Sequence, residues 1–407
     1  MKILPELYVK AGVSAPGKGK FMASAVTTVT NARAVLGGKI RSCNLRLSDG
    51  KIQGILPPGD AYGRVIDAHG ALTVPGFLDA CTRGALGISF NAAGAKDVRA
   101  LRDFYASHGV TAFLPAITAD SEEAMLRAAG AIAAAKSQLG CSQIAGIHLE
   151  GPFLSPQWRD DLPQEALRQP SYPIYRRIQD ASGGLVTRVT LSPELPGAPE
   201  LTGRLASEGV LVTLGYSGAS YEEAMECVRA GALGVSCLFR AMPPLSREEP
   251  GILGAALEQD LFCELLCDPG FLPPALTRLV LRAKGPFRTV AVTGSEAPTG
   301  LAEGLYRLRE RPVALRDGAL RSLEGGGWAG SVLTADRLLG RLMEITGLPV
   351  EQCLPLLTEA PARMLGLGHR KGSLEVGKDA DLVFLDKEYR VRATISQGAV
   401  IYDASAI

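Results

Sequence analysis

Alternating hydrophobic and polar residues mark both ends of the chain. From residue 26 to residue 74 the alternating runs are short and broken by turns, and Ser48-Asp49-Gly50 is typical of a hairpin. The same alternation returns in GSLEVGKDADLVFLD, residues 372–386, and in RVRATISQGAVIYD, residues 390–403. Because alternation buries one face of a strand, the pattern predicts two β-rich ends, which we expect to pair into one small β-sandwich.

Between these ends, short apolar segments alternate with amphipathic helices. One such helix reads SEEAMLRAAGAIAAAKSQ and opens on Ser121, with acidic residues in its first turn. Eight segments have the length and apolar character of buried strands: residues 73–79, 111–116, 144–150, 186–191, 211–216, 234–238, 262–267 and 289–293. Eight strands alternating with helices predict a (β/α)8 barrel, an α/β fold in which function lies at the C-terminal ends of the strands.

The domain boundaries follow from these patterns. We expect a composite β-sandwich domain from residues 25–74 and 368–407, and a barrel domain at 75–367. Residues 1–24 carry scattered glycine, proline and lysine without a continuous apolar run, which predicts a flexible extension rather than a secretory signal. Met22 stands directly before the first strand-like run, so Met1 and Met22 are alternative starts.

Composition narrows the classes of function. The 407 residues are 46% hydrophobic and 21% charged, with a net charge of +1. This balance gives no global field for nucleic acid or anionic membranes, so any anion site must be local. No apolar run is long enough to cross a bilayer. The eight cysteines are irregularly spaced and include no CxxC pair, which is typical of reduced, buried thiols in a cytoplasmic protein.

Several motifs occur in an order and spacing that resemble one family. The most specific is GIHLEGPFLSP (146–156), because His-Leu-Glu-Gly-Pro after a strand is hard to reach by chance. It is accompanied by VPGFLDACTRG (74–84), GVTAFLPAIT (109–118), LGYSGASYEEA (214–224), SCLFRAMPPLSREEPGILGAAL (236–257), VTGSEAP (292–298) and KGSLEVGKDADLVFLD (371–386). Over roughly residues 25–405, the chain resembles the N-acetylglucosamine-6-phosphate deacetylases of the amidohydrolase superfamily.

The resemblance implies a homodimeric, metal-dependent hydrolase of amide C–N bonds in amino sugar metabolism, yet most of the groups for that chemistry are missing. Amide hydrolysis of this kind needs a divalent metal that generates hydroxide. It also needs carboxylate and imidazole ligands for that metal at the strand ends, and an aspartate base after the eighth strand. By the resemblance, Glu150 is a retained ligand. By the same resemblance, four positions at which the family has metal ligands are occupied by Cys81, Arg83, Tyr216 and Cys237. Phe271 stands in place of a family histidine, Arg240 in place of an asparagine on the phosphate side, and Gly294 in place of the catalytic aspartate.

Arg83 and Arg240 have two interpretations. If they face the site, they are partners for Glu150 and convert a cation site into an anion site, because a guanidinium binds phosphate or carboxylate through two hydrogen bonds. Alternatively, both lie in solvent at the barrel rim. His148 either points into the site or is hydrogen-bonded beside it. We expect Glu296 to be a solvated loop acid.

Cys81 and Cys237 leave three alternatives open. Together with Glu150 they form a potential zinc site, because thiolates bind zinc well. They could also form a disulfide. The third interpretation, small apolar fillers, is favoured by the six other scattered cysteines.

The sequence therefore predicts a pseudoenzyme that needs no cofactor. It would bind a small anionic molecule such as a sugar phosphate, or regulate a partner, with no nucleic-acid or membrane partner. The expected binding residues are Arg83, His148, Arg240 and Phe271. The alternatives are an amidohydrolase with changed chemistry that uses one zinc at Cys81, Glu150 and Cys237, or a residual N-acetyl amino-sugar-phosphate deacetylase.

Overall fold

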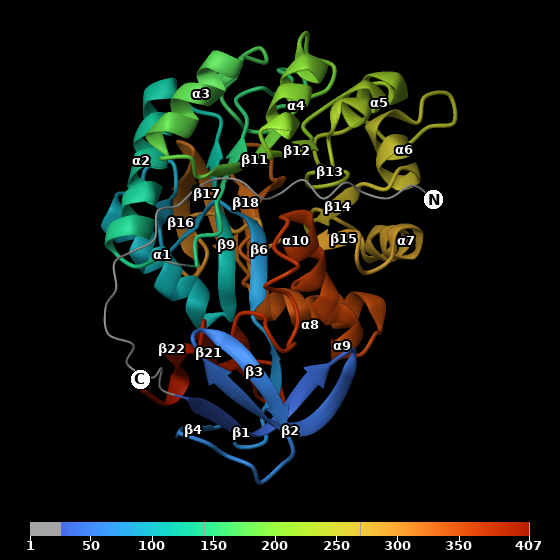
Figure 1. Cartoon of the computed structure of the whole chain (residues 1–407). Coiled ribbons are helices and arrows are strands. Elements are labelled where there is room, and N and C mark those ends of the chain that lie inside the picture. Colours follow the sequence, from blue (N-terminus) through green and yellow to red (C-terminus); the bar gives the residue numbers. More distant parts are fainter. Residues whose placement is uncertain (1–25, 142, 269, 407) are drawn as a thin grey trace.

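The computed structural model describes residues 26–141, 143–268 and 270–406 (Figure 1). The expected extension at residues 1–24, and with it the choice between Met1 and Met22, lies outside the described residues. In Figure 1 the helices and strands of a barrel lie above a mixed sheet, in which blue N-terminal strands meet red C-terminal strands.

Eight parallel strands form the barrel, in the order β15-β14-β13-β12-β11-β10-β9-β6. They are β6 (Phe77–Thr82), β9 (Val110–Thr118), β10 (Ile147–Glu150), β11 (Val186–Leu191), β12 (Leu211–Leu214), β13 (Gly234–Val235), β14 (Phe262–Leu265) and β15 (Thr289–Ala291). Just beyond β15, the backbone N–H of Gly294 donates to the carbonyl of Cys81 at 3.0 Å. This bond brings the last strand end onto β6, so the sheet nearly closes.

A helix follows each barrel strand. These helices are α1 (Ala95–Ser107), α2 (Glu122–Gln138), α3 (Tyr172–Ala181), α4 (Ala198–Ser207), α5 (Tyr221–Ala230), α6 (Gly251–Glu258), α7 (Pro274–Lys284) and α8 (Ala335–Thr346). The predicted start of α2 is confirmed, because the Ser121 side chain accepts a hydrogen bond from the Ala124 N–H at 3.2 Å. The predicted (β/α)8 barrel is confirmed with it.

The mixed sheet joins the two ends of the chain. Its order is β22-β21-β20-β5-β1-β2-β3, and β4 pairs with β1. The strands are β1 (Thr27–Leu36), β2 (Lys39–Ser48), β3 (Lys51–Leu56), β4 (Arg64–Asp67), β5 (Leu72–Pro75), β20 (Leu382–Leu385), β21 (Val391–Ser396) and β22 (Ala399–Asp403). The composite β-sandwich of the predicted fold is thus confirmed, whereas the boundaries 25–74, 75–367 and 368–407 stay a prediction.

The first barrel strand was predicted wrongly. In place of one strand at 73–79, the chain forms β5 in the mixed sheet and then β6 in the barrel, with Gly76 between them. A Cβ at Gly76 would lie 2.1 Å from Oγ1 of Thr111, so only glycine allows this close approach. The apolar run is continuous because both strands are buried, which hides the change of sheet.

A further four-stranded antiparallel sheet, absent from the sequence prediction, lies between β15 and α8. Its strands are β16 (Gly304–Leu308), β17 (Arg311–Arg316), β18 (Ala319–Ser322) and β19 (Trp328–Gly330). The remaining elements are β7 (Gly84–Ala85), β8 (Ile88–Ser89), η1 (Gln164–Ala166), α9 (Val350–Cys353), η2 (Leu354–Leu356), α10 (Glu359–Met364) and η3 (Ala404–Ala406).

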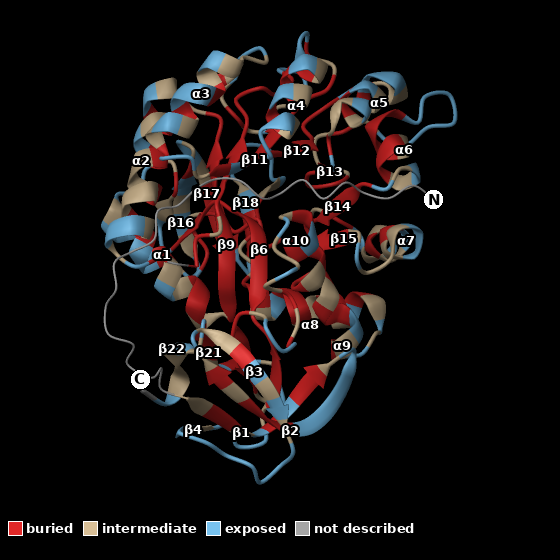
Figure 2. Ribbon diagram, viewed as in Figure 1, coloured by how far each residue is buried: buried red, intermediate tan, exposed pale blue. Residues whose placement is uncertain are grey.

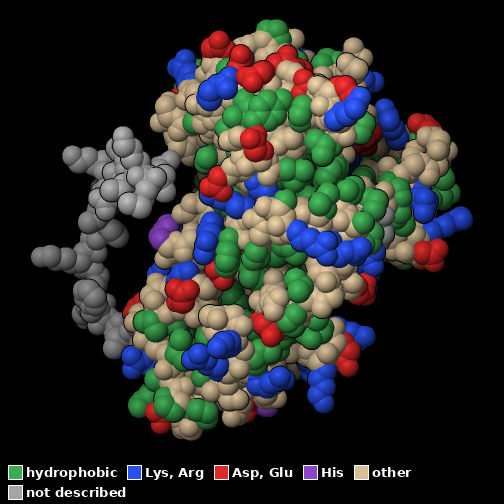
Figure 3. All heavy atoms as spheres, turned by 90° about the vertical axis from the view of Figure 1, so that its right-hand side faces the viewer, with side chains coloured by type: hydrophobic (Ala, Val, Ile, Leu, Met, Phe, Trp, Pro, Cys, Tyr) green, Lys and Arg blue, Asp and Glu red, His purple; other side chains and the backbone are tan. Residues whose placement is uncertain are grey.

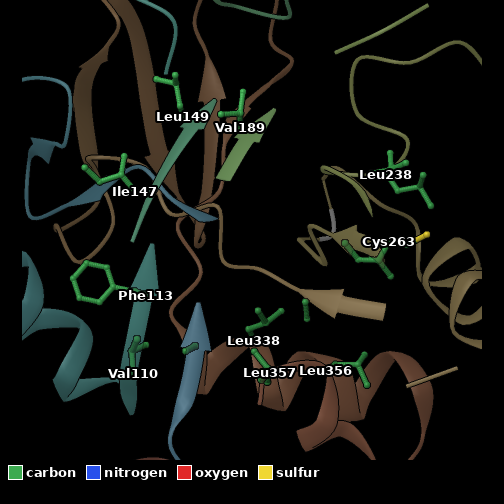
Figure 4. Packing of buried hydrophobic residues seen from close by; sticks show 14 of the residues in the cluster. Val110, Phe113, Ile147, Leu149, Val189, Leu238, Cys263, Leu338, Leu356 and Leu357 are labelled. Atoms are coloured by element: carbon green, nitrogen blue, oxygen red, sulfur yellow. The ribbon is translucent and has the colours of Figure 1, made fainter. Parts of the chain in front are cut away.

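Burial follows this architecture. The barrel strands are red in Figure 2, whereas the outer faces of the helices are tan and pale blue. Phe113 of β9, Ile147 and Leu149 of β10 and Val189 of β11 are fully buried and belong to one hydrophobic cluster (Figure 4). Such burial is the main stabilising contribution to the barrel that positions the strand ends. In the described ranges, no helix combines the length and apolar character required to cross a membrane.

Candidate functional site

The barrel mouth keeps unusual backbone geometry at the positions that by resemblance held functional groups. Tyr216 after β12, Cys237 after β13 and Gly294 after β15 have φ values of 50°, 44° and 54°. Left-handed conformations are costly for tyrosine and cysteine and gather at functional sites, where the surrounding structure maintains them. The barrel mouth therefore contains three strand ends with left-handed backbone conformations.

Arg83 and Glu150 form the centre of the mouth. Nε of Arg83 donates to Oε2 of Glu150 at 2.6 Å, and Nη2 donates to Oε1 at 2.5 Å. The hydroxyl of Tyr216 donates to Oε1 of Glu150 at 2.9 Å. The Arg83 and Glu150 side chains are 2% and 0% exposed, which excludes the interpretation of Arg83 as a solvated rim residue. Both carboxylate oxygens are thus already bound by a bidentate guanidinium.

Burial and charge pairing have opposite effects on the pKa values of Glu150 and Arg83. Burial raises the pKa of Glu150, but Arg83 outweighs it and holds the pKa well below its ordinary range. Burial lowers the pKa of Arg83, but Glu150 outweighs it and the pKa is raised. Burial and the Glu150 charge raise the pKa of Tyr216 well above its ordinary value, so its hydroxyl keeps its proton and donates.

A second layer of ion pairs lies over this centre. Nη1 of Arg83 is 3.5 Å from Oε1 of Glu296, which also accepts from Nη2 of Arg309 at 2.8 Å. Nη1 of Arg309 then reaches Oδ2 of Asp161 at 2.8 Å. Arg309 lies in the turn between β16 and β17, so the added sheet supplies a cation to the mouth. The expectation for Glu296 is wrong: its side chain is 2% exposed because two guanidinium groups compensate its burial.

Arg240 lies in the same mouth but pairs with a different carboxylate. Its Nε and Nη2 each lie 2.7 Å from Oδ2 of Asp160, so the expected pairing of Arg240 with Glu150 is wrong. The guanidinium carbon is 4.8 Å from the centroid of the Phe271 ring. The Arg240 side chain is 8% exposed, and its Nη1 has no hydrogen-bond partner among the described residues. Arg240 is therefore buried at the mouth rather than solvated.

The mouth carries slightly more negative than positive charge. Three guanidinium groups face four carboxylates, a difference of one negative charge: Arg83, Arg240 and Arg309 against Glu150, Asp160, Asp161 and Glu296. The carboxylates of the mouth therefore compete with an incoming anion for its guanidinium groups.

His148 is buried beside the site. Its Nε2 lies 2.7 Å from Oγ1 of Thr190, and Nδ1 lacks a hydrogen-bond partner within the described ranges. Burial and the positive charge of Arg188 lower the pKa of His148 well below its ordinary value, so the imidazole is neutral. The structure thus places His148 in the interior, bonded to a neighbouring strand.

The thiols of Cys81 and Cys237 are free and buried in this structure, with no disulfide between them. Burial is the largest cause that raises the pKa of each thiol, so both are protonated rather than thiolate. Zinc binds thiolate, and the oxygens of Glu150 are occupied by Arg83. Over the part of the chain that the structure describes, no three His, Cys, Asp or Glu side chains group so as to hold a metal. These residues do not fit a catalytic metal.

Two buried charges that sequence reasoning missed lie deeper in the barrel. Arg188 of β11 and Glu264 of β14 are both 0% exposed and form a bidentate pair, with Nη2 2.6 Å from Oε2. Oγ of Ser236 donates to the same carboxylate at 2.9 Å. The signal was available, because VTRVTL and LFCELLC each carry one charge inside an apolar strand. A lone charge in a buried strand requires an opposite charge from another strand.

Asp79 of β6 is another buried carboxyl and takes no part in the ion pairs of the mouth. It accepts from Oγ1 and N of Thr293 at 2.5 and 3.3 Å and from N of Cys81 at 3.4 Å. Burial raises its pKa to about 6, against the lowering effect of these hydrogen bonds. Between pH 4 and pH 6 the folded protein therefore binds more protons than the unfolded chain, and stability falls as pH rises through this window.

We predict that Asp79→Asn removes this part of the pH dependence. The variant cannot ionise, so its free energy of unfolding relative to wild type should rise by about 2 kcal/mol between pH 4 and pH 7.5. Urea unfolding at both pH values measures the change. Asp180→Asn, on the exposed face of α3, is the control. A variant-to-wild-type difference that is the same at both pH values would contradict the prediction.

Comparisons with known proteins agree with this architecture. The model of the amidohydrolase family matches residues 328–402. The N-acetylglucosamine-6-phosphate deacetylase of Bacillus subtilis (strain 168) is 31% identical over 89% of this chain and 93% of its own length. The crystal structure of N-acetylglucosamine-6-phosphate deacetylase from Pasteurella multocida is 26% identical, with a TM-score of 0.87 over 92% of this chain and 99% of that one.

A second similar structure carries a ligand. It is an aspartate-to-alanine mutant of N-acetyl-D-glucosamine-6-phosphate deacetylase from Mycobacterium smegmatis, in complex with N-acetyl-D-glucosamine-6-phosphate. It is 29% identical to this chain, with a TM-score of 0.84 over 93% of this chain and 100% of that one.

Proposed function

The chain belongs to the N-acetylglucosamine-6-phosphate deacetylase family, and we propose that within this family it is a non-hydrolytic member that binds a small anionic ligand such as a sugar phosphate. One observation carries the proposal: the guanidinium of Arg83 binds both oxygens of Glu150, the retained ligand carboxylate. A cationic side chain thus lies where the family resemblance implies a metal. We include in the proposal a cytoplasmic homodimer, as that resemblance implies.

The loss of hydrolysis has a second cause in the missing base. An aspartate at position 294 would have to adopt a φ of 54°, and its Cβ would lie 2.6 Å from Cδ1 of Leu266. A base therefore cannot be restored there without moving Leu266 and straining the backbone. Loss of a general base by itself typically lowers the rate by about 10²- to 10⁴-fold.

We predict no deacetylation. Protein expressed and assayed with added zinc, iron or manganese should contain far less than one metal ion per chain. It should release amine from N-acetylglucosamine 6-phosphate at least about 10³-fold more slowly than the 1 s⁻¹ at the low end of enzyme turnover. Elemental analysis and an amine assay measure both quantities.

Two results would refute this proposal. Turnover of about 1 s⁻¹ that Glu150→Gln abolishes would establish a residual deacetylase. About one tightly held metal ion per chain would favour the alternative zinc site at Cys81, Glu150 and Cys237.

Arg240 is the group best placed to hold an anionic ligand. Its Nη1 is buried without a partner in the described structure, and its other nitrogens bind Asp160, whose side chain is 36% exposed. Asp160 lies in a loop with a φ of 59°, a left-handed conformation that aspartate tolerates better than most residues. An arriving phosphate could therefore take over the guanidinium while the carboxylate returns to water.

We predict that Asp160 and the ligand compete for Arg240. Asp160→Asn should strengthen binding of N-acetylglucosamine 6-phosphate by about tenfold, because a charged competitor is lost. Arg240→Ala should weaken it by about 10- to 100-fold, and Arg240→Lys by less, because lysine keeps the charge without the fork. Calorimetry measures each affinity, with Asp260→Asn, from the outlying pair with Arg288, as control. Binding that is unchanged in Arg240→Ala would contradict the role of this residue.

A further inference from the structure

A second cavity lies away from the barrel mouth. It has a volume of about 490 Å³ and is lined by the β1–β2 hairpin, the segment from α7 to Phe287, and the segment from Leu348 to Glu359. Two elements that line it, α7 and α9, lie on the right-hand side of the molecule in Figure 1, the side that faces the viewer in Figure 3. Its volume is in the range of small-molecule sites, and such sites occur preferentially where two structural units meet, as the barrel and the mixed sheet do here.

The walls of this cavity are mostly apolar. Val35 comes from β1, Leu281 from α7, and Phe287, Leu348 and Leu354 from the loops and turn around them. Phe287 is 40% exposed, so part of its aromatic surface is in contact with water. Burial of apolar area against these side chains favours a ligand with a hydrocarbon or aromatic body.

The charged residues of the lining are all acidic. Glu351, Glu359 and Glu375 line the cavity, and none of its described lining residues is lysine, arginine or histidine. Burial, the largest cause, raises the pKa of Glu359 despite the opposing charges of Arg363 and Lys378. The cavity thus combines apolar walls with an excess of negative charge.

Nearby cations compensate these carboxylates only in part. Nη2 of Arg363 is 3.4 Å from Oε2 of Glu359, and Nζ of Lys378 is 3.7 Å from Oε1 of Glu375. Glu351 makes no salt bridge within the described parts of the chain. The guanidinium carbon of Arg363 also lies 4.3 Å from the centroid of the Phe287 ring. One half-buried carboxylate is left for a cation from outside.

We propose that this cavity binds a small organic cation, a protonated amine attached to an aromatic or branched hydrocarbon body. The body lies against Leu281, Leu348 and Leu354, and the ammonium group pairs with Glu351 and approaches Glu359. The site is independent of the barrel mouth and goes beyond the proposed function. One of the segments that line it is hydrogen-bonded to β6, because the carbonyl of Leu357 accepts from the N–H of Leu78 at 2.8 Å.

Three probes of one shape test the charge requirement. The full-length protein is titrated with phenethylamine, with 2-phenylethanol as the neutral isostere and with 3-phenylpropionate as the anion, by calorimetry or ligand-observed NMR. The amine should bind saturably and at least about tenfold more tightly than the alcohol, because the ion pair adds to the same apolar contact. The carboxylate should not bind measurably.

Variants locate the site. Glu351→Gln should weaken amine binding by about tenfold without changing alcohol binding, and Glu351→Gln/Glu359→Gln should remove the preference for the amine. Leu281→Trp should fill the cavity and abolish both; if it does not fold, the glutamine variants still decide. Glu344→Gln, on an exposed part of α8, is the matched control and should have no effect. Equal affinity for amine and carboxylate, no saturable amine binding, or a preference that survives Glu351→Gln/Glu359→Gln would overturn the proposal.

Discussion

Replacing Arg83 with methionine should lower the free energy of unfolding by about 3–5 kcal/mol at pH 7.5, because it leaves the buried charge of Glu150 unpaired. The pair is almost fully buried, and Arg83 supplies both hydrogen bonds that bridge the carboxylate oxygens. Chemical unfolding measures the loss. Glu150→Gln in the same chain removes the unpaired charge, so Arg83→Met/Glu150→Gln should recover most of the lost stability.

The pH dependence of this loss identifies its cause. Without Arg83, burial raises the folded-state pKa of Glu150 above its unfolded value. The free energy of unfolding of the variant therefore falls as pH rises and recovers as pH falls. The deficit relative to wild type should therefore shrink toward pH 4. Arg127→Met, which breaks an exposed pair with Glu123 on α2, should leave stability nearly unchanged. A deficit below about 1 kcal/mol, or one of constant size from pH 4 to pH 7.5, would contradict the buried-pair explanation.

Replacing Glu264 with glutamine should lower the free energy of unfolding by a similar amount, about 3–5 kcal/mol, but this loss should depend differently on pH. Arg188 would remain fully buried, with hydrogen bonds to Thr213, Ser236 and the carbonyl of Ala80 but no opposite charge. An arginine cannot discard its proton at accessible pH, so mild alkali does not relieve the penalty. The deficit relative to wild type should stay constant from pH 6 to pH 8, where carboxylates are ionised in the unfolded chain as well.

A double replacement distinguishes the effect of an unpaired buried charge from the effect of lost packing and hydrogen bonds. Arg188→Met/Glu264→Met removes both charges and fills part of the same volume, so it should be close to wild type in stability. Unfolding of the two variants in parallel gives the comparison. If the double variant is as unstable as Glu264→Gln, packing and hydrogen bonds rather than unpaired charge explain the loss.

The Arg83–Glu150 pair also connects strand ends that have an unusual backbone conformation. Tyr216 and Cys237 retain positive φ at the strand ends, although tyrosine and cysteine gain nothing from that conformation. Arg83, hydrogen-bonded to Glu150 and within 3.4 Å of the Tyr216 hydroxyl, links strand ends in a way that a bound metal would. We infer that this guanidinium helps to maintain the inherited backbone of the mouth.

Most of the fold could be predicted from local patterns. Apolar runs separated by amphipathic helices identify seven barrel strands, and alternation at both chain ends identifies the strands of the mixed sheet. The first barrel strand and the sheet from β16 to β19 could not be placed in this way. Gly76 allows the chain to change sheets inside one apolar run, and nothing local marks the approach of Thr111 that requires it.

The sequence alone determined which chemical groups stand at the strand ends: Arg83, Glu150, Tyr216, Cys237 and Gly294 follow from motif order, and of these only Glu150 and Cys237 are of types that bind zinc. Only the tertiary structure decided which charges meet. Arg83 pairs with Glu150 and Arg240 with Asp160, residues 67 and 80 positions apart in the chain. The reason is physical: a buried charge needs an opposite charge within about 4 Å, and the barrel closure, not the spacing along the chain, brings such partners within that distance.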